Sequence, residues 1–375
     1  MDKENREIGV HQFTLMVIFF GMGSSILIAP ASLAIIAKQD AWISSIIGTL
    51  MDLIPVVVYA GLIRLYPRKS ILEMNELAFG KWLGIAVSLL YVFFFFVLSY
   101  ALLGDVGYFL TTQVMPETPI VFIMSCMMLV ALMAVRLGPD VIARGSEVFF
   151  PWVMLLFFLL VIMLLPKTEV HKMQPIMEFG AVPALRAAFP YGSLQEYVVL
   201  MMLLPYVKSS PKIHSSFFAG VIAAGAVVFV IMLLCIVVLG PGLTSVNLYP
   251  TLTLAKKISI GKFLERVEVI IGGMWLITIT FKLIMTFFAT AAGLTQIFRF
   301  NNYAFLTVPL AMLVVVFVMP TYTNIVVVVD FVDRVWPYFS WLFMLVLPTA
   351  AWVALWVRRL AAKGVDDDSP QVESG

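Results

Sequence analysis

The sequence predicts an all-α polytopic membrane protein of ten transmembrane helices, built as a five-plus-five inverted repeat in which helices one and six are broken. Composition supports the membrane class, because 62% of the 375 residues are apolar and only 12% are charged. A soluble domain of this length could not bury that much apolar surface. Glycine and proline interrupt the first and the sixth apolar segments, and these interruptions support the repeat.

Ten apolar segments are long enough to cross a bilayer, whose core of about 30 Å needs about 20 helical residues. They lie near residues 12–37, 41–63, 83–113, 119–137, 147–165, 181–207, 216–239, 267–298, 303–320 and 336–357. The third and the eighth segments are longer than a helix needs to cross the bilayer perpendicular to its plane, so we expect them to tilt or to project into water. Between the segments, Ile63–Leu83 and Pro166–Gly180 are interpreted as polar loops, and Tyr249–Ile258 as a short surface helix.

Residues 1–363 are expected to form a single transmembrane domain. Its first repeat would run from about residue 10 to 165, and its second from about residue 181 to 358. Residues 364–375 are polar and include three consecutive aspartates, which is typical of a disordered tail. We expect this tail to be cytoplasmic.

Positive charge favours a topology with both termini in the cytoplasm. With the N-terminus inside, fourteen of the 24 lysine and arginine residues lie on the inner side and nine on the outer side, and Lys282 lies within a span. A reporter domain fused after Arg359 is therefore expected to be cytoplasmic, and one inserted in the loop 169–178 to be external. Reporters that indicate the same side of the membrane at both positions would contradict the ten-span topology.

Two apolar segments carry the signature of broken helices. The first contains Gly21-Met22-Gly23-Ser24-Ser25 followed by Pro30, and the sixth contains Phe189-Pro190-Tyr191-Gly192-Ser193. Glycine loosens a helix and proline removes a hydrogen-bond donor, so both segments are predicted to unwind near mid-depth. Unwound backbone at that depth is tolerated where it lines a cavity, and matched breaks in two inverted halves indicate a transporter-type binding site. The alternative is that these glycines only allow tight helix packing.

Such breaks suit a small zwitterion. The second half of helix one would begin near Ser24, with free N–H groups and the positive end of its dipole available to a carboxylate. The first halves of both helices would end in free carbonyl groups, which suit an ammonium group. An α-amino acid carries both charges.

Three charged residues, Asp52, Glu196 and Lys282, lie near the middle of spans. Ionisable groups at that depth normally face a polar interior. Lys282 lies about 22 Å along its helix from either end, too far for its side chain to reach a headgroup region. Asp52 is interpreted as an anchor between helices, and Glu196 either lines the cavity or forms a structural pair. Asp105 falls near the outer end of span three and is interpreted as interfacial.

Several local motifs resemble one membrane protein family over nearly the whole chain, from Glu7 to about Arg359. They are Val10–Phe20 running into Gly21–Pro30, then Ala188–Gly192, Asn247–Pro250 and Ile258–Glu268. On these residues the chain resembles the B subunit of bacterial spore germinant receptors, within the amino acid–polyamine–organocation transporter superfamily. The resemblance implies the LeuT-like fold.

The resemblance also implies a function and a set of partners. The protein would be a nutrient sensor in the spore inner membrane, acting beside an A-type membrane subunit and a C-type lipoprotein, and binding of an amino acid would trigger germination. The residues carried over to the ligand site are Gly21, Gly23, Ser24 and Ser25 at the polar end, Phe189, Tyr191, Gly192 and Ser193 on the opposing wall, and Leu98, Ala101 and Thr286 on spans three and eight. Relatives often read Gly-Phe-Glu after the sixth-span break, whereas this chain reads Gly-Ser-Leu-Gln-Glu196, so the role of Glu196 stays open.

Two interpretations of the Lys282 ammonium group follow from this family context. In sodium-coupled relatives of the fold, span eight and the first break together hold a cation, and the Lys282 ammonium could replace that ion. Thr278, Lys282, Thr286 and Thr290 recur every four residues as a polar stripe, which supports an inward-facing lysine. Ligand binding would then be independent of sodium, and Lys282 and Glu196 could be proton-linked. The alternative is a structural ion pair of Lys282 with Asp52 or Glu196.

Three functions stay open on the sequence: a ligand-sensing receptor subunit, a proton-coupled and sodium-independent amino acid transporter, and a structural or channel-forming membrane partner. We expect no enzyme activity and no cofactor, because the sequence lacks catalytic motifs and its three histidines form no ligand constellation. The net charge of +2 gives no indication of a nucleic-acid partner. Cys126 and Cys235 are expected to be free packing residues.

Overall fold

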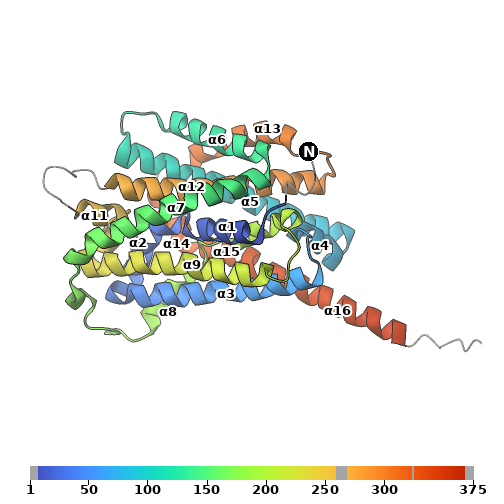
Figure 1. The fold of residues 1–375 in the computed structure, drawn as a ribbon, viewed down its shortest axis with the longest axis horizontal. Helices are drawn as coiled ribbons and strands as arrows, with labels where there is room; N and C mark the ends of the chain where they lie inside the picture. The colour runs from blue at the N-terminus through green and yellow to red at the C-terminus, as the bar shows by residue number, and fades with distance from the viewer. Residues whose placement is uncertain (1–6, 259–267, 323–324, 368–375) are drawn as a thin grey trace, which may run out of the picture.

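The structure, a computed structural model, describes residues 7–258, 268–322 and 325–367, and this part of the chain is a bundle of long helices (Figure 1). The α-helices are α1 Val10–Met22, α2 Ser25–Ala37, α3 Ala41–Leu65, α4 Ile71–Phe79, α5 Lys81–Phe109, α6 Ile120–Leu137, α7 Pro139–Leu164, α8 Val182–Gly192, α9 Ile213–Leu234, α10 Pro241–Val246, α11 Pro250–Lys256, α12 Glu268–Ile297, α13 Ala304–Thr321, α14 Ile325–Arg334, α15 Trp336–Trp341 and α16 Leu347–Asp367. Wider π-helical turns follow α5, α9 and α15, at Leu110–Val114, Cys235–Leu239 and Leu342–Val346.

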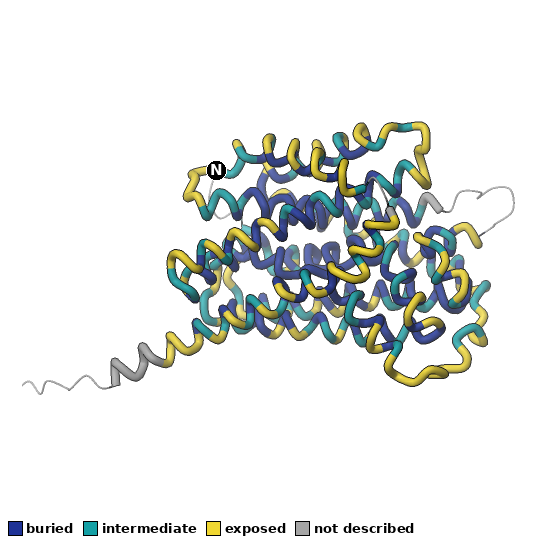
Figure 2. Tube along the Cα trace, turned by 180° about the vertical axis from the view of Figure 1, so that it is seen from behind, coloured by how far each residue is buried: buried dark blue, intermediate teal, exposed yellow. Residues whose placement is uncertain are grey.

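The helices have the length and composition of membrane spans. Eight helical stretches in the described residues are long and apolar enough to cross a bilayer, and α1 is a shorter apolar helix. Dark, buried segments concentrate inside the bundle and exposed ones at its surface (Figure 2). Large apolar side chains such as Trp82 and Trp152 nevertheless lie exposed on that surface, where lipid can cover them. The multi-pass membrane class predicted from composition is confirmed.

Both predicted helix breaks are present. The α-helix α1 ends at Met22 and α2 begins at Ser25, so the first span is interrupted at Gly23 and Ser24. In the sixth span α8 ends at Gly192, and the chain then continues through residues 193–196 without regular helix. The second half of this span is not an α-helix, because Tyr197–Met202 and Leu204–Tyr206 form short 3₁₀-helical turns. The two long spans were also predicted correctly, since α5 and α12 contain 29 and 30 residues.

Two predicted connections differ from the structure. The supposed polar loop Ile63–Leu83 contains α4, which begins with a capping box in which Ser70 and Glu73 exchange side-chain and backbone hydrogen bonds of 2.8 and 3.2 Å. The helix predicted at Tyr249–Ile258 exists as α11 but is not a surface helix. Its Thr251 is buried and donates a 2.7 Å hydrogen bond to the Ile26 carbonyl of α2.

The C-terminal region also differs from the expectation. No helix was predicted between spans nine and ten, yet α14 forms there from a segment rich in β-branched valine, a residue of modest helix propensity. Residues 364–367 of the expected tail belong to α16, which continues to Asp367. The remainder of that tail lies outside the described residues. Cys126 and Cys235 are free, as expected.

Candidate ligand-binding site

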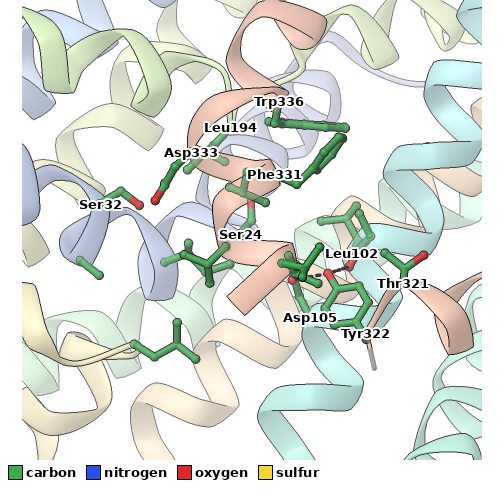
Figure 3. Close-up of a pocket in the computed structure, with 18 of the residues that line it drawn as sticks. Ser24, Ser32, Leu102, Asp105, Leu194, Thr321, Tyr322, Phe331, Asp333 and Trp336 are labelled. Atoms are coloured by element: carbon green, nitrogen blue, oxygen red, sulfur yellow. Dashed lines mark hydrogen bonds between the residues drawn. The ribbon is translucent and has the colours of Figure 1, made fainter. Parts of the chain in front are cut away.

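A cavity of about 510 Å³ lies beside the two breaks (Figure 3). Ser24 contributes to its wall from the first break, and Leu194 and Glu196 contribute from the second. The rest of the wall comes from α2, α5, the α10–α11 region, the end of α13, α14 and Trp336 of α15. Its volume is in the range of sites that hold small molecules.

The wall of this cavity is mainly apolar and its ionisable side chains are acidic. Ile28 and Leu98 are typical of the apolar part, and the carboxyl groups are those of Asp105, Glu196 and Asp333. Among the described residues, no lysine, arginine or histidine lines the cavity. Glu196 forms an ion pair with Lys282. The remaining negative charge favours a cationic group in the ligand.

Lys282 of α12 connects the two breaks. Its Nζ lies 2.7 Å from Glu196 Oε2 and donates hydrogen bonds to Ser24 Oγ at 3.0 Å and to the Leu194 carbonyl at 2.6 Å. The Lys282 side chain is completely buried, and Nζ also lies 5.1 Å from the centre of the Phe20 ring. All three ammonium hydrogens therefore have oxygen partners, and these partners belong to both broken spans.

Glu196 extends this connection to the cavity wall. Its second oxygen accepts a 3.1 Å hydrogen bond from Trp336 Nε1. The Trp336 ring stacks on Phe94 of α5 at 5.7 Å, and Phe94 stacks on Phe343 at 4.6 Å. The ion pair is thus coupled mechanically to α15 and α5, two elements that form the cavity.

Asp52 does not form the alternative ion pair with Lys282. Its carboxyl is buried and Oδ1 has no hydrogen-bond partner within the part of the chain that the structure describes. It lies next to Gly192 at the end of α8. Of the two pairings left open for Lys282, the structure contains the one with Glu196.

The residues expected to bind ligand separate into two groups. Four of them line the cavity: Ser24, Leu98, Ala101 and Glu196. The others do not line it: Gly21, Gly23, Ser25, Phe189, Tyr191, Gly192, Ser193, Thr286 and Lys282.

The residues of spans one and eight that do not line the cavity support the break. Gly21 faces the Tyr197 hydroxyl group, and Gly23 faces the stem of Lys282. The Ser25 hydroxyl accepts a 2.9 Å hydrogen bond from Gln195 Nε2. Thr286 is buried and donates to the Lys282 carbonyl at 2.8 Å, so its side chain bonds within its own helix.

The corresponding residues on span six pack against α3 and α15. Phe189 stacks on Trp341 at 5.8 Å, and Gly192 faces the same indole. The Ser193 carbonyl accepts a 2.8 Å hydrogen bond from Ser340 Oγ. Tyr191 is buried against Gly48. These residues hold the break in place and do not form the opposing wall of this cavity.

The sequence missed the polar residues on the far side of the cavity. Asp105, interpreted as interfacial, lines the cavity and accepts a 2.7 Å hydrogen bond from the Tyr322 hydroxyl. A signal for Asp105 was present, because Leu98, Ala101 and Asp105 are spaced as one helix face. No comparable signal marks Tyr322 or Trp336, which reach the cavity from the ends of distant helices.

Asp333 on α14 is the third acidic residue of the wall, and it is exposed. Partial burial raises the pKa of its carboxyl group, Asp330 raises that pKa further, and Arg334 lowers it. In Figure 3 Asp333 and Ser32 lie on one side of the cavity, and Asp105 and Tyr322 on the other.

Comparisons with known proteins agree on family and fold. Residues 7–326 match the family model described as spore germination protein. Spore germination protein KB of Bacillus subtilis (strain 168) is 29% identical over 332 residues, which cover 86% of this chain and 87% of that protein. The crystal structure of MhsT in complex with L-phenylalanine is similar with a TM-score of 0.63 and 15% identity, covering 94% of this chain and 98% of MhsT. Mhp1, a nucleobase-cation-symport-1 family transporter solved with bromovinylhydantoin bound, gives a TM-score of 0.67 and 12% identity, covering 99% and 95%.

Proposed function

The chain belongs to the spore germination protein family, and from this premise we propose that it is the ligand-sensing membrane subunit of a spore germinant receptor. It binds a small nutrient such as an amino acid in the cavity beside the two helix breaks, and binding triggers germination. The observation that carries this proposal is the cavity itself, whose wall includes residues of both breaks. In transporters of this fold, broken helices form the ligand site near the middle of the membrane.

The polar end of the cavity supports an amino acid as ligand. No side chain caps the N-terminus of α2, and Ser24 at that position lines the cavity. The partial positive charge of a helix N-terminus favours a carboxylate there. Ile28, Leu98 and Ala101 supply apolar surface for a side chain. MhsT, which shares the fold, was solved with L-phenylalanine bound.

The proposed receptor role also specifies where the protein is located and which subunits it contacts. The protein lies in the spore inner membrane with both termini cytoplasmic, beside an A-type membrane subunit and a C-type lipoprotein. The connection from the breaks through Glu196 and Trp336 to α15 offers a route by which ligand binding reaches the outer helices. A co-purification of the three subunits from spore membranes tests this part of the proposal.

The Lys282 ammonium takes the place of a coupling cation in this proposal. It joins the first break to span eight through Ser24, and its partner Glu196 belongs to the second break. A second candidate function is a proton-coupled, sodium-independent amino acid transporter, which the buried ionisable groups Asp52, Glu196 and Lys282 favour. Uptake of labelled ligand into vesicles with an imposed proton gradient identifies the transporter, whereas binding without uptake supports the sensor.

The ligand is found by a thermal-shift screen of the twenty amino acids on the purified full chain. The receptor proposal expects a stabilising, saturable shift with a subset of them, since a ligand that binds only the folded state raises the unfolding temperature. Absence of a shift with every amino acid would contradict an amino acid as ligand.

Ala101 is expected to set the size of the accepted side chain. Ala101→Leu adds volume to a wall residue, so the profile of active amino acids should move towards smaller side chains, with about a tenfold or larger loss for the bulkiest ligand. Thr286→Val is the matched control, because Thr286 is buried and does not line the cavity, so its change leaves the cavity shape intact. The same thermal-shift panel reads out both variants. An unchanged profile in Ala101→Leu would place the ligand outside this cavity.

A further inference from the structure

The groups at the breaks that would bind a ligand ammonium are already occupied. The Leu194 carbonyl, the Ser24 hydroxyl and the Glu196 carboxylate all accept hydrogen bonds or charge from Lys282 Nζ, at 2.6, 3.0 and 2.7 Å. A second ammonium at the same place would meet the first in a buried, low-dielectric environment, where like charges repel strongly. The positive group of a ligand must therefore bind elsewhere in the cavity.

Asp105 is a partly buried acid of the cavity wall that has no salt-bridge partner among the described residues. Within the described residues no lysine, arginine or histidine forms a salt bridge with it, and its carboxyl group accepts a 2.7 Å hydrogen bond from the Tyr322 hydroxyl. Glu196, by contrast, is paired with Lys282, and Asp333 is exposed. A partly buried carboxylate in an apolar wall is costly unless a cation neutralises it.

The hydrogen bonds of Tyr322 also indicate that the cluster lacks a donor. The hydroxyl group has one proton, yet it lies 2.7 Å from Asp105 Oδ1 and 2.8 Å from the Ala101 carbonyl. Both of these neighbours are acceptors when Asp105 is ionised, so the cluster has more acceptors than donors. An ammonium group brings three hydrogen-bond donors and one positive charge. It would supply the missing donors and neutralise the Asp105 carboxylate.

The fold holds this cluster in a defined geometry. A methyl group at Gly104 would overlap the Tyr322 ring, so the absence of a side chain at Gly104 lets that ring lie directly on α5. The Tyr322 hydroxyl then reaches two residues of the same helix, Ala101 and Asp105. Tyr100 and Tyr249 line the same cavity, and aromatic rings favour nearby cations.

We propose that Asp105, oriented by Tyr322, binds the protonated amine of the ligand, and that the ligand class is therefore amines, including amino acids. This inference rests on the proposed function for the location of the ligand, and it adds where the positive group binds. Asp105 lies about 10 Å along α5 from Leu98 at 1.5 Å per residue, and it contacts Tyr322 at the end of α13. The amine is therefore expected at the α13 end of the cavity.

The test compares ligands that differ only in the amine. The panel contains the twenty amino acids, the α-hydroxy acid analogues of leucine, phenylalanine and alanine, and butylamine, and binding is measured on the purified full chain. In the wild type each amino acid that binds should do so at least about 30-fold more tightly than its α-hydroxy analogue, the scale expected for a buried charge pair. Asp105→Asn should reduce this preference to less than about fivefold.

Two further variants serve as controls. Asp330→Asn removes the same charge from an exposed position of α14 outside the cavity wall and should leave the amine preference within about threefold of wild type. Tyr322→Phe keeps the Asp105 charge but removes its hydroxyl partner, so it should weaken binding while it keeps the preference for the amine. If Asp105→Asn is not recovered folded, weaker binding with a retained amine preference in Tyr322→Phe, together with unchanged binding in Asp330→Asn, supports the cluster, and an unchanged affinity in Tyr322→Phe overturns it.

The outcomes separate the two proposals. If the affinity ratio between an amino acid and its α-hydroxy analogue is the same in the wild type and in Asp105→Asn, the amine site is rejected. The sensor proposal is then unaffected. Asp105-dependent binding of butylamine without binding of any amino acid supports the amine site and rejects an amino acid as the nutrient. Absence of binding by every member of the panel rejects both. Affinity that depends on sodium in wild type but not in Asp105→Asn shows that the oxygen cluster holds a metal cation, and it overturns the amine site.

Discussion

Lys282→Met is expected to abolish the ligand response and to lower the free energy of unfolding by about 3 to 5 kcal/mol, the scale for removing one partner of a buried ion pair. Methionine cannot replace the ammonium that bonds Glu196, Ser24 and the Leu194 carbonyl. The Glu196 carboxylate would be left without a cation in a completely buried position. Chemical unfolding of the purified protein and a germination assay in spores measure the two effects.

A second substitution separates the structural role of this ion pair from a role in ligand binding. Lys282→Met combined with Glu196→Gln removes both charges, so most of the lost stability should return. Recovery of the ligand response along with stability would make Lys282 a purely structural partner, and recovery of stability alone would support Lys282 as a substitute for a coupling cation. Lys208→Met, at an exposed lysine, controls for the loss of one positive charge. A single Lys282→Met variant with normal stability would contradict the buried ion pair.

Gly23→Leu is also expected to abolish the ligand response, for a reason that only the structure supplies. The sequence places Gly23 against the ligand, whereas in the structure a Cβ atom at this position would lie 2.6 Å from Lys282 Cδ and 2.9 Å from Lys282 Cβ. Leucine would push the lysine stem away from the break and separate its ammonium from Glu196. Overpacking alone typically costs about 1 to 3 kcal/mol, and the unpaired charge adds to that.

Gly273→Leu is the matched control for this substitution. Gly273 lies on α12 like Lys282, but no atom lies within 4 Å of the position where its Cβ would be. Its substitution should therefore leave membrane insertion, stability and ligand response close to wild type. Membrane expression, unfolding and germination should be compared in the two variants. A Gly23→Leu protein that responds normally would show that Lys282 can leave its position without consequence.

Sequence patterns were sufficient for the long apolar spans and for the two breaks. Long apolar runs predict spans because the bilayer demands them, and the Gly21–Ser25 and Phe189–Ser193 motifs interrupt those runs at positions where α1 and α8 end. Lys282 could be placed inside the protein by distance alone, since its side chain is too short to reach either surface. Its partner could not be chosen, because Asp52 and Glu196 are equally central along their spans.

The cavity itself required the three-dimensional structure. Helix rotation decides whether a residue such as Thr286 faces the cavity or its own helix backbone, and the uniformly apolar spans give little periodicity to read. The second half of span six adopts 3₁₀ turns because tertiary packing overrides local preference there. Tyr322 and Trp336 come from helix ends far from Asp105 and Glu196 in the chain, so no local pattern could bring them together.

The covalent attachment of the Lys282 ammonium has a thermodynamic consequence. A diffusible ion that assists ligand binding is linked to the ligand reciprocally, so each raises the affinity for the other and both concentrations enter the dose–response curve. A tethered ammonium has a fixed local concentration and cannot exchange with the medium. If Lys282 fills the role of that ion, the nutrient threshold is set by the nutrient alone, and the receptor gives the same response in dilute and in saline surroundings.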